Sequence, residues 1–215
     1  MDWSPLGISI KTALLATTIT VVIGIPAALL LSREWRGKHL VSSLVILPLV
    51  LPPTVLGYFL LVLLGKRSPL GQWYEAIFHH TLVFTWQGAA VAASVASIPL
   101  MVTQAVVAFT SVGNEIQDAA RIGGASELDV LRYITLPLAR RGLLAGLTLS
   151  FARSLGDFGA TLMVAGDIPG STQTMPLAIY DALQTGDTKT VVTFVVIASA
   201  IAIAATLTAG YFAER

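Results

Sequence analysis

Two ionisable residues, Arg153 and Asp157, interrupt an apolar stretch that runs from Leu143 to Ala165. Because they are four residues apart, both side chains lie on one face of a helix and can form an ion pair. Each charge at the centre of a membrane helix costs about 2.5 to 3.5 kcal/mol, so a partner or a water-filled space must compensate it. The pair therefore indicates either a polar path through a membrane or a polar contact between packed helices.

The neighbours of this pair on a regular helix are small or polar. Within an arc of about 100° the helix would carry Gly146, Ser150, Arg153, Ser154, Asp157 and Thr161. Two interpretations stay open: this face lines or gates a water-accessible pathway, or it pairs the helix with its neighbours through a stripe of small residues. The candidate residues for either role are Ser150, Arg153, Ser154, Asp157 and Thr161.

The longest polar segment runs from Asn114 to Pro137. Asn114 and Ser126 each start a capping pattern with a polar or acidic residue three positions later, and two glycines separate the patterns. The segment therefore predicts a polar hairpin, with one helix at Glu115–Ile122 and a second from about Glu127 to Pro137. It fits both a solvated hairpin without a partner and a docking surface for another protein.

The elements that hold these residues are apolar enough to cross a membrane. Of the 215 residues, 55% are hydrophobic and 12% are charged, and the mean hydropathy is +0.79, which is atypical of a water-soluble domain. Five stretches reach the roughly 20 residues that a helical span needs: Ile8 to Leu31, Val41 to Leu64, Leu82 to Phe109, Leu143 to Ala165 and Val191 to Phe212. The sequence predicts an all-α, polytopic membrane protein.

Two further features are expected near the second span. The prolines Pro48, Pro52 and Pro53 predict a broken or strongly bent helix, because each removes a backbone donor. The segment that follows, Lys66 to Thr81, carries several aromatic residues and is expected to form a short helix along the membrane surface.

Lys and Arg in the loops predict the orientation of the chain. One side of the membrane collects eight of them: Arg33, Arg36, Lys38, Arg121, Arg132, Arg140, Arg141 and Arg215. The other side collects four: Lys11, Lys66, Arg67 and Lys189. We therefore expect the polar hairpin and the C-terminus in the cytoplasm and the N-terminus outside.

Several kinds of chemistry are disfavoured. The chain has no cysteine, and the adjacent residues His79 and His80 would point apart on a helix, so no metal site is predicted. An intramembrane hydrolase would need a base at membrane depth, whereas the histidines lie in predicted loops. No phosphate-binding G-x-x-x-x-G-K-[ST] motif and no basic run for nucleic acid occur. We expect no catalytic residue and no cofactor in this chain.

The polar hairpin resembles the EAA loop of ABC-importer permeases, in which E-A-A is followed by a glycine four residues later and by a distal L-P. The resemblance assigns ATPase coupling to Asp118, Ala119, Ala120, Arg121, Gly124, Ala125, Leu136 and Pro137. Asp118 departs from the usual Glu by one methylene, and Gly123 replaces an apolar residue. In that family, this loop is seated in a groove of a separate ATP-binding subunit. A channel that needs no ATPase would not explain the pattern.

The resemblance extends over most of the chain and is strongest to the molybdate branch of these permeases. It is carried by LPLVLPPTVLGYFLL at 47–61, RSPLGQWYEAIF at 67–78, VFTWQGAAVAA at 83–93 and FARSLGDFGATLMVAGDIPGSTQTMPLAIYDALQ at 151–184. Sulfate and thiosulfate permeases share the ARSLGDFGA piece, so these oxyanions and tungstate remain alternatives to molybdate.

The resemblance implies a type I ABC importer permease fold with five to six transmembrane helices. Residues 1–215 would form a single permease domain, with the coupling loop at about 110–142. The implied partners are a second copy of the chain, two ATP-binding subunits that hold ATP and Mg²⁺, an external molybdate-binding protein and the lipid of the cell membrane. Molybdate would be recognised chiefly by the binding protein.

Overall fold

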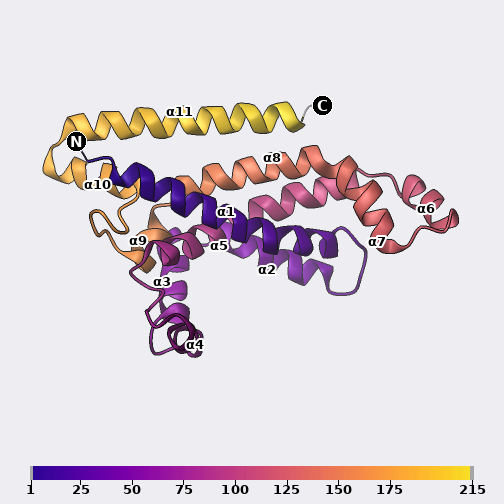
Figure 1. Ribbon diagram of the computed structural model, residues 1–215, viewed down its shortest axis with the longest axis horizontal. Coiled ribbons are helices and arrows are strands. Elements are labelled where there is room, and N and C mark those ends of the chain that lie inside the picture. The colour runs from indigo at the N-terminus through magenta and orange to yellow at the C-terminus, as the bar shows by residue number, and fades with distance from the viewer. Residues whose placement is uncertain (1, 214–215) are drawn as a thin grey trace.

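The structure is a computed structural model that describes residues 2–213, and all regular elements in this range are helices (Figure 1). The all-α prediction is confirmed. Arg215, which we counted for the orientation, lies outside the described residues. The long helices α1 (Ser4–Leu31), α5 (Trp86–Thr110), α8 (Leu136–Leu155) and α11 (Thr188–Ala213) run along a common direction (Figure 1). By length and apolarity, α1, α5 and α11 can each cross a membrane.

The second predicted span is broken, as expected, into α2 (Lys38–Val50) and α3 (Pro53–Leu64), which meet at 110°. Leu51 and Pro52 adopt extended backbone between them, and Pro53 has no N–H to continue the helix. As one bent span, this pair would raise the number of candidate membrane spans to four. α3 leaves the bundle sideways, and α4 (Pro69–Phe78) lies at its far tip (Figure 1).

The predicted span from Leu143 to Ala165 is wrong in its bounds. The helix α8 begins earlier, at Leu136, and ends at Leu155; a separate helix, α9 (Gly159–Ala165), follows the break. The predicted stop at Pro137 is also wrong. Pro137 is the second residue of α8, and α7 (Glu127–Val130) with a π-helical turn (Leu131–Thr135) runs directly into α8.

Small residues allow the helices of the bundle to approach closely. Ala89, Ala93 and Ala105 of α5 are fully buried, and a Cβ at Gly142 of α8 would lie 2.5 Å from Cβ of Ala108 on α5. Such contacts replace the hydrophobic effect as the source of packing energy inside a membrane. The remaining elements are α6 (Asn114–Ile122), at one end of the bundle, and α10 (Met175–Thr185), which lies at the other end and precedes α11 (Figure 1).

Candidate functional site

The polar hairpin, residues 114–137, extends beyond one end of the bundle (Figure 1). Its first helix, α6, starts one residue earlier than predicted: Gly113 occupies the cap position, and Asn114 makes no capping hydrogen bond. The second cap is confirmed. Ser126 Oγ accepts from Asp129 N–H at 3.2 Å, and Asp129 Oδ2 accepts from Ser126 Oγ at 2.6 Å and from Ser126 N–H at 3.1 Å. The hydrogen bond from the Ser126 hydroxyl, followed by the one from its N–H, lowers the pKa of Asp129.

A glycine turn joins the two helices of the hairpin. Gly124 has φ +92°, a left-handed conformation that costs other residues about 1 to 2 kcal/mol. Gly124 N–H donates to Arg121 O, and Ala125 N–H donates to Ala120 O, each at 3.0 Å, so the turn satisfies the last carbonyls of α6. Gly124 therefore has a conformational reason to be glycine, whereas Gly123, at φ −70° and ψ 0°, is not in a left-handed conformation.

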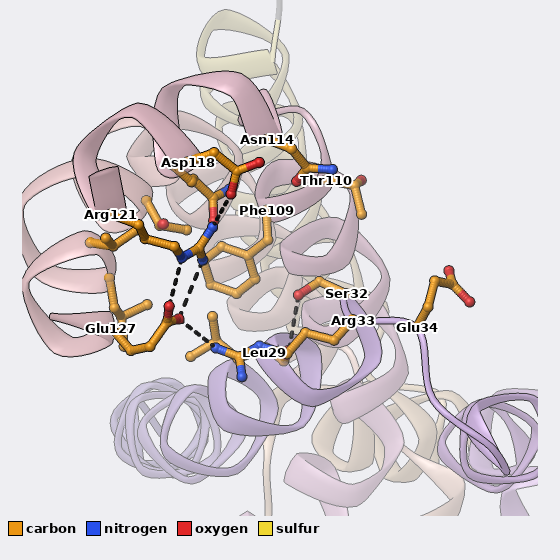
Figure 2. Close-up of a pocket in the computed structure, with 14 residues that line it drawn as sticks. Leu29, Ser32, Arg33, Glu34, Phe109, Thr110, Asn114, Asp118, Arg121 and Glu127 are labelled. Carbon is orange, nitrogen blue, oxygen red and sulfur yellow. Dashed lines mark hydrogen bonds and ion pairs between the residues drawn. The ribbon is translucent and has the colours of Figure 1, made fainter. Parts of the chain in front are cut away.

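Four charged side chains connect the hairpin to α1 (Figure 2). Arg121 lies between two acids: Nη1 is 2.7 Å from Asp118 Oδ1, and Nε is 2.6 Å from Glu127 Oε1. Glu127 Oε2 is 3.3 Å from Arg121 Nη2 and 3.7 Å from Nη2 of Arg33, just beyond the end of α1. The hydrogen bond from Arg121 lowers the pKa of Glu127, and the two acids raise the pKa of Arg121.

We name this set of Arg33, Asp118, Arg121 and Glu127 the charge chain. It fixes the angle between α6 and α7, because Arg121 and Glu127 lie on opposite sides of the glycine turn. Sequence reasoning missed Arg33 and Glu127, since only the Asp118–Arg121 spacing is a helical neighbour pair. A cavity of about 770 Å³ lies beside the charge chain, between the ends of α1 and α5 and the hairpin (Figure 2).

The outer surface of the hairpin mixes small and apolar residues. Ile122 is 89% exposed and Leu128 is 70% exposed, whereas Ala119 is exposed and Ala120 is half-buried. Exposed apolar side chains next to small residues form a surface on which another protein can pack closely. Leu136 and Pro137 do not belong to this tip but start α8.

The second candidate site lies at the break between α8 and α9. The periodic pattern placed Asp157 on a helix. In the structure Asp157 instead lies in the break between α8 and α9, where it is 2% exposed. The predicted ion pair is nevertheless present: Arg153 Nη1 is 3.1 Å from Asp157 Oδ1. Asp157 Oδ2 also accepts from Thr161 N–H at 3.0 Å and from Thr161 Oγ1 at 2.8 Å. A carboxylate with these partners is held in place at the start of α9.

The two serines of the predicted face have different surroundings. Ser154 Oγ lies 2.8 Å from Ser97 Oγ on α5, so this residue contributes to helix pairing. Ser150 is fully buried, and its hydroxyl has no hydrogen-bond partner within residues 2–213. The structure thus brings Arg153, Asp157 and Thr161 together at the break. The residues that were predicted to form one helix face therefore fall into two groups, because Ser150 and Ser154 lie within α8.

Comparisons with known proteins agree with this architecture. The family model of binding-protein-dependent transport system inner membrane components matches residues 20–215. The molybdenum transport system permease protein ModB of Escherichia coli (strain K12) is 44% identical over 185 residues, which cover 86% of this chain and 81% of that protein. ModB of Haemophilus influenzae is 40% identical over 186 residues, which cover 86% and 81%.

A solved structure shares the fold at low sequence identity. The inward-facing methionine ABC transporter MetNI matches with a TM-score of 0.71 and 18% identity, over 97% of this chain and 94% of that one.

Proposed function

The chain belongs to the family of binding-protein-dependent transport system inner membrane components, and from this premise we propose that it forms the transmembrane pathway for molybdate in an ATP-driven importer. Two relatives named as molybdenum transport permeases, each at least 40% identical over most of the chain, support molybdate as the cargo. Tungstate, sulfate and thiosulfate are the alternative cargoes. As a permease subunit the chain is not an enzyme; ATP hydrolysis belongs to a separate subunit that binds ATP and Mg²⁺.

The observation that carries this proposal is the rigid hairpin at the end of the bundle. Its turn is built on Gly124 at positive φ, and its two helices are joined by Arg121 and Glu127. A loop that transmits force must keep its shape when a partner pushes on it, and a helix pair joined by a glycine turn and an ion pair does so. Ile122 and Leu128 supply the apolar contact area for the ATP-binding subunit.

Each proposed coupling residue then has a physical task. Ala119 and Ala120 let the partner's backbone approach, Gly124 and Ala125 form the turn, and Asp118 orients Arg121. Leu136 and Pro137 begin α8 and therefore connect the hairpin to the bundle. From Glu127 to Leu155 the backbone is helical without interruption, so a displacement of the hairpin reaches the break at Gly156. Arg153 and Asp157 at this break are the proposed pathway residues.

The orientation that fits this mechanism places the hairpin and the C-terminus in the cytoplasm and the N-terminus outside, in agreement with the Lys and Arg count. The whole chain acts as a single permease domain. Two copies side by side, with two ATP-binding subunits and an external molybdate-binding protein, would complete the transporter. Symmetry would then bring both breaks to one shared axis.

The experiment that tests the proposal is reconstitution. The chain is co-purified with its ATP-binding subunit, placed in vesicles, and supplied with the binding protein and one oxyanion at a time. We expect molybdate to stimulate ATP hydrolysis and to accumulate in the vesicle compartment that faces the ATP-binding subunit. Stimulation by sulfate and not by molybdate would refute the cargo, and uptake without the ATP-binding subunit would refute coupled transport.

A further inference from the structure

A second cavity, of about 540 Å³, lies between three helices at the end of the bundle next to the hairpin. The last turns of α5 and the first turns of α8 form two of its walls, and Phe212 lines it from α11. α11 ends at the same end of the bundle at which α8 begins (Figure 1). Gly142 of α8 and Ala108 of α5 both line the cavity, and a Cβ at Gly142 would lie 2.5 Å from Ala108 Cβ. This close contact makes the cavity a recess, because α5 and α8 leave no space between them there.

The polar side chains of this recess include two cations. Arg140 and Arg141 line it from α8, and Gln104 lines it from α5. Both arginines are exposed. No Asp or Glu is among the lining residues in the described part of the chain, in contrast to the charge chain, where two acids balance two arginines. A guanidinium group donates two parallel N–H bonds to a phosphate or carboxylate. The recess is therefore suited to an anion.

The rest of the wall is apolar and partly open to the surroundings. Val107 of α5 and Leu138 of α8 are 64% and 55% exposed, and Phe212 is half-buried. A small hydrated anion gains nothing from such a wall, whereas a hydrocarbon chain packs against it. Cations beside an apolar wall therefore fit a molecule that has an acidic headgroup and a hydrocarbon tail.

The lengths of the helices place the recess at the membrane boundary. The spans in α5 and α11 have 25 residues each, which is about 38 Å at a rise of 1.5 Å per residue. The hydrocarbon layer of a bilayer is roughly 30 Å thick, so the last turn of each helix reaches the headgroups when the span is centred. Val107 and Phe212 belong to these last turns. The recess thus lies at the depth of lipid headgroups.

We propose that this recess binds an anionic phospholipid, with its phosphate at Arg140 and an acyl chain along Val107 and Leu138. Basic pockets between membrane helices on the cytoplasmic side take such headgroups, and the amide of Gln104 can donate to a headgroup oxygen. The inference rests on the proposed cytoplasmic position of the hairpin and does not depend on the cargo. A lipid bound here would join the first turns of α8, which continue the hairpin, to the end of α11.

The test measures lipid binding to the full chain, purified in detergent in the assembly that it forms. Fluorescent phosphatidylglycerol is titrated onto the protein, and phosphatidylcholine with the same acyl chains is the neutral comparison. Arg140→Gln removes the proposed phosphate ligand, and Val107→Trp fills the apolar wall without changing the charge. Arg132→Gln is the matched control, because Arg132 lies over the ring of Tyr133, at 5.6 Å from its centre, and is not one of the lining residues.

We expect phosphatidylglycerol to bind more tightly than phosphatidylcholine. Arg140→Gln should weaken the binding of phosphatidylglycerol by about tenfold, as the loss of one charge-assisted hydrogen bond does, and should leave phosphatidylcholine unchanged. Val107→Trp should weaken both lipids, and Arg132→Gln should weaken neither.

Four outcomes would overturn the proposal. Equal affinity for the two lipids, or an equal loss in Arg132→Gln and Arg140→Gln, would show that the recess does not select an anionic headgroup. Displacement of phosphatidylglycerol by inorganic phosphate would assign the recess to a free anion. No binding at all would show that a second copy or another subunit covers it, and unchanged affinity in Val107→Trp would contradict the place of the acyl chain. A cargo other than molybdate would alter none of these results, so the two proposals fail independently.

Discussion

The substitution Gly124→Ala tests whether the shape of the hairpin controls coupling. A Cβ at Gly124 meets no atom within 4 Å, so the change adds no clash and acts only through φ +92°. Alanine in this conformation costs about 1 to 2 kcal/mol, which corresponds to a factor of about 5 to 30 in an equilibrium constant. Where the free hairpin relaxes this strain and docking restores it, the affinity for the ATP-binding subunit should fall by up to a factor in this range.

The assay is titration of the ATP-binding subunit onto the reconstituted permease, together with ATP hydrolysis stimulated by the loaded binding protein. Gly123→Ala is the matched control, because the neighbouring glycine has φ −70° and lacks this left-handed strain, while its Cβ would lie 3.3 Å from Ala120 O. Gly170→Ala is a second control, because it introduces the same positive-φ strain, at φ +72°, outside the hairpin, in the loop between α9 and α10. If Gly124→Ala docked with unchanged affinity, or if Gly123→Ala lost as much, the turn geometry would not be the determinant.

Three further perturbations test other parts of the structure. The pKa of Glu127 is lowered from 4.5, so the ion pair stabilises the hairpin above that pH and the stabilisation is lost as the pH falls through the lower pKa of the folded state. Protection of residues 114–130 from hydrogen exchange, measured relative to the intrinsic exchange rate at each pH, should therefore decrease in acid. Glu127→Gln should reduce this dependence and leave the part that comes from Asp129. Gly142→Val should destabilise the bundle by about 1 to 3 kcal/mol, because its Cβ position is 2.5 Å from Ala108 Cβ, whereas Gly7→Ala, in α1 with open space around it, should not lower the Tm. Arg153→Gln or Asp157→Asn alone should reduce uptake by correctly inserted protein, because each leaves one charge without its partner; the double variant should recover part of the uptake if pairing is what matters, and normal uptake in both single variants would exclude a pathway role.

Features set by neighbouring residues were predictable from the sequence. The capping box of Ser126 and Asp129 needs only a spacing of three residues, and the bend at Pro52 and Pro53 needs only the absence of two N–H groups. The positive φ of Gly124 could be expected because glycine commonly ends a helix in that conformation. In each case the cause lies within one turn of the chain.

Features set by competition or by tertiary contact were not predictable. The periodic pattern treated Leu143–Ala165 as one helix, but the Asp157 carboxylate accepts from Thr161 N–H and thereby starts a new helix after Gly156. Arg33 and Glu127 are far apart in sequence and meet only because α1 ends beside α7. A single sequence contains no signal for such a contact, so half of the charge chain was missed.

In the proposed coupling, the π-helical turn at Leu131–Thr135 lies where force would pass from the hairpin into the membrane. Leu136 N–H donates to Leu131 O, five residues back, and Pro137 has no N–H with which to reinforce the next turn. A π-helical turn holds one residue more than an α-helical turn. Its return to α-helical geometry would rotate α8, which follows it, by about 100°. The helix that joins the hairpin to the break at Gly156 therefore resists twisting least at Leu131–Thr135, next to the hairpin. A displacement of the hairpin can thus rotate α8 about its own axis as well as shift it along that axis.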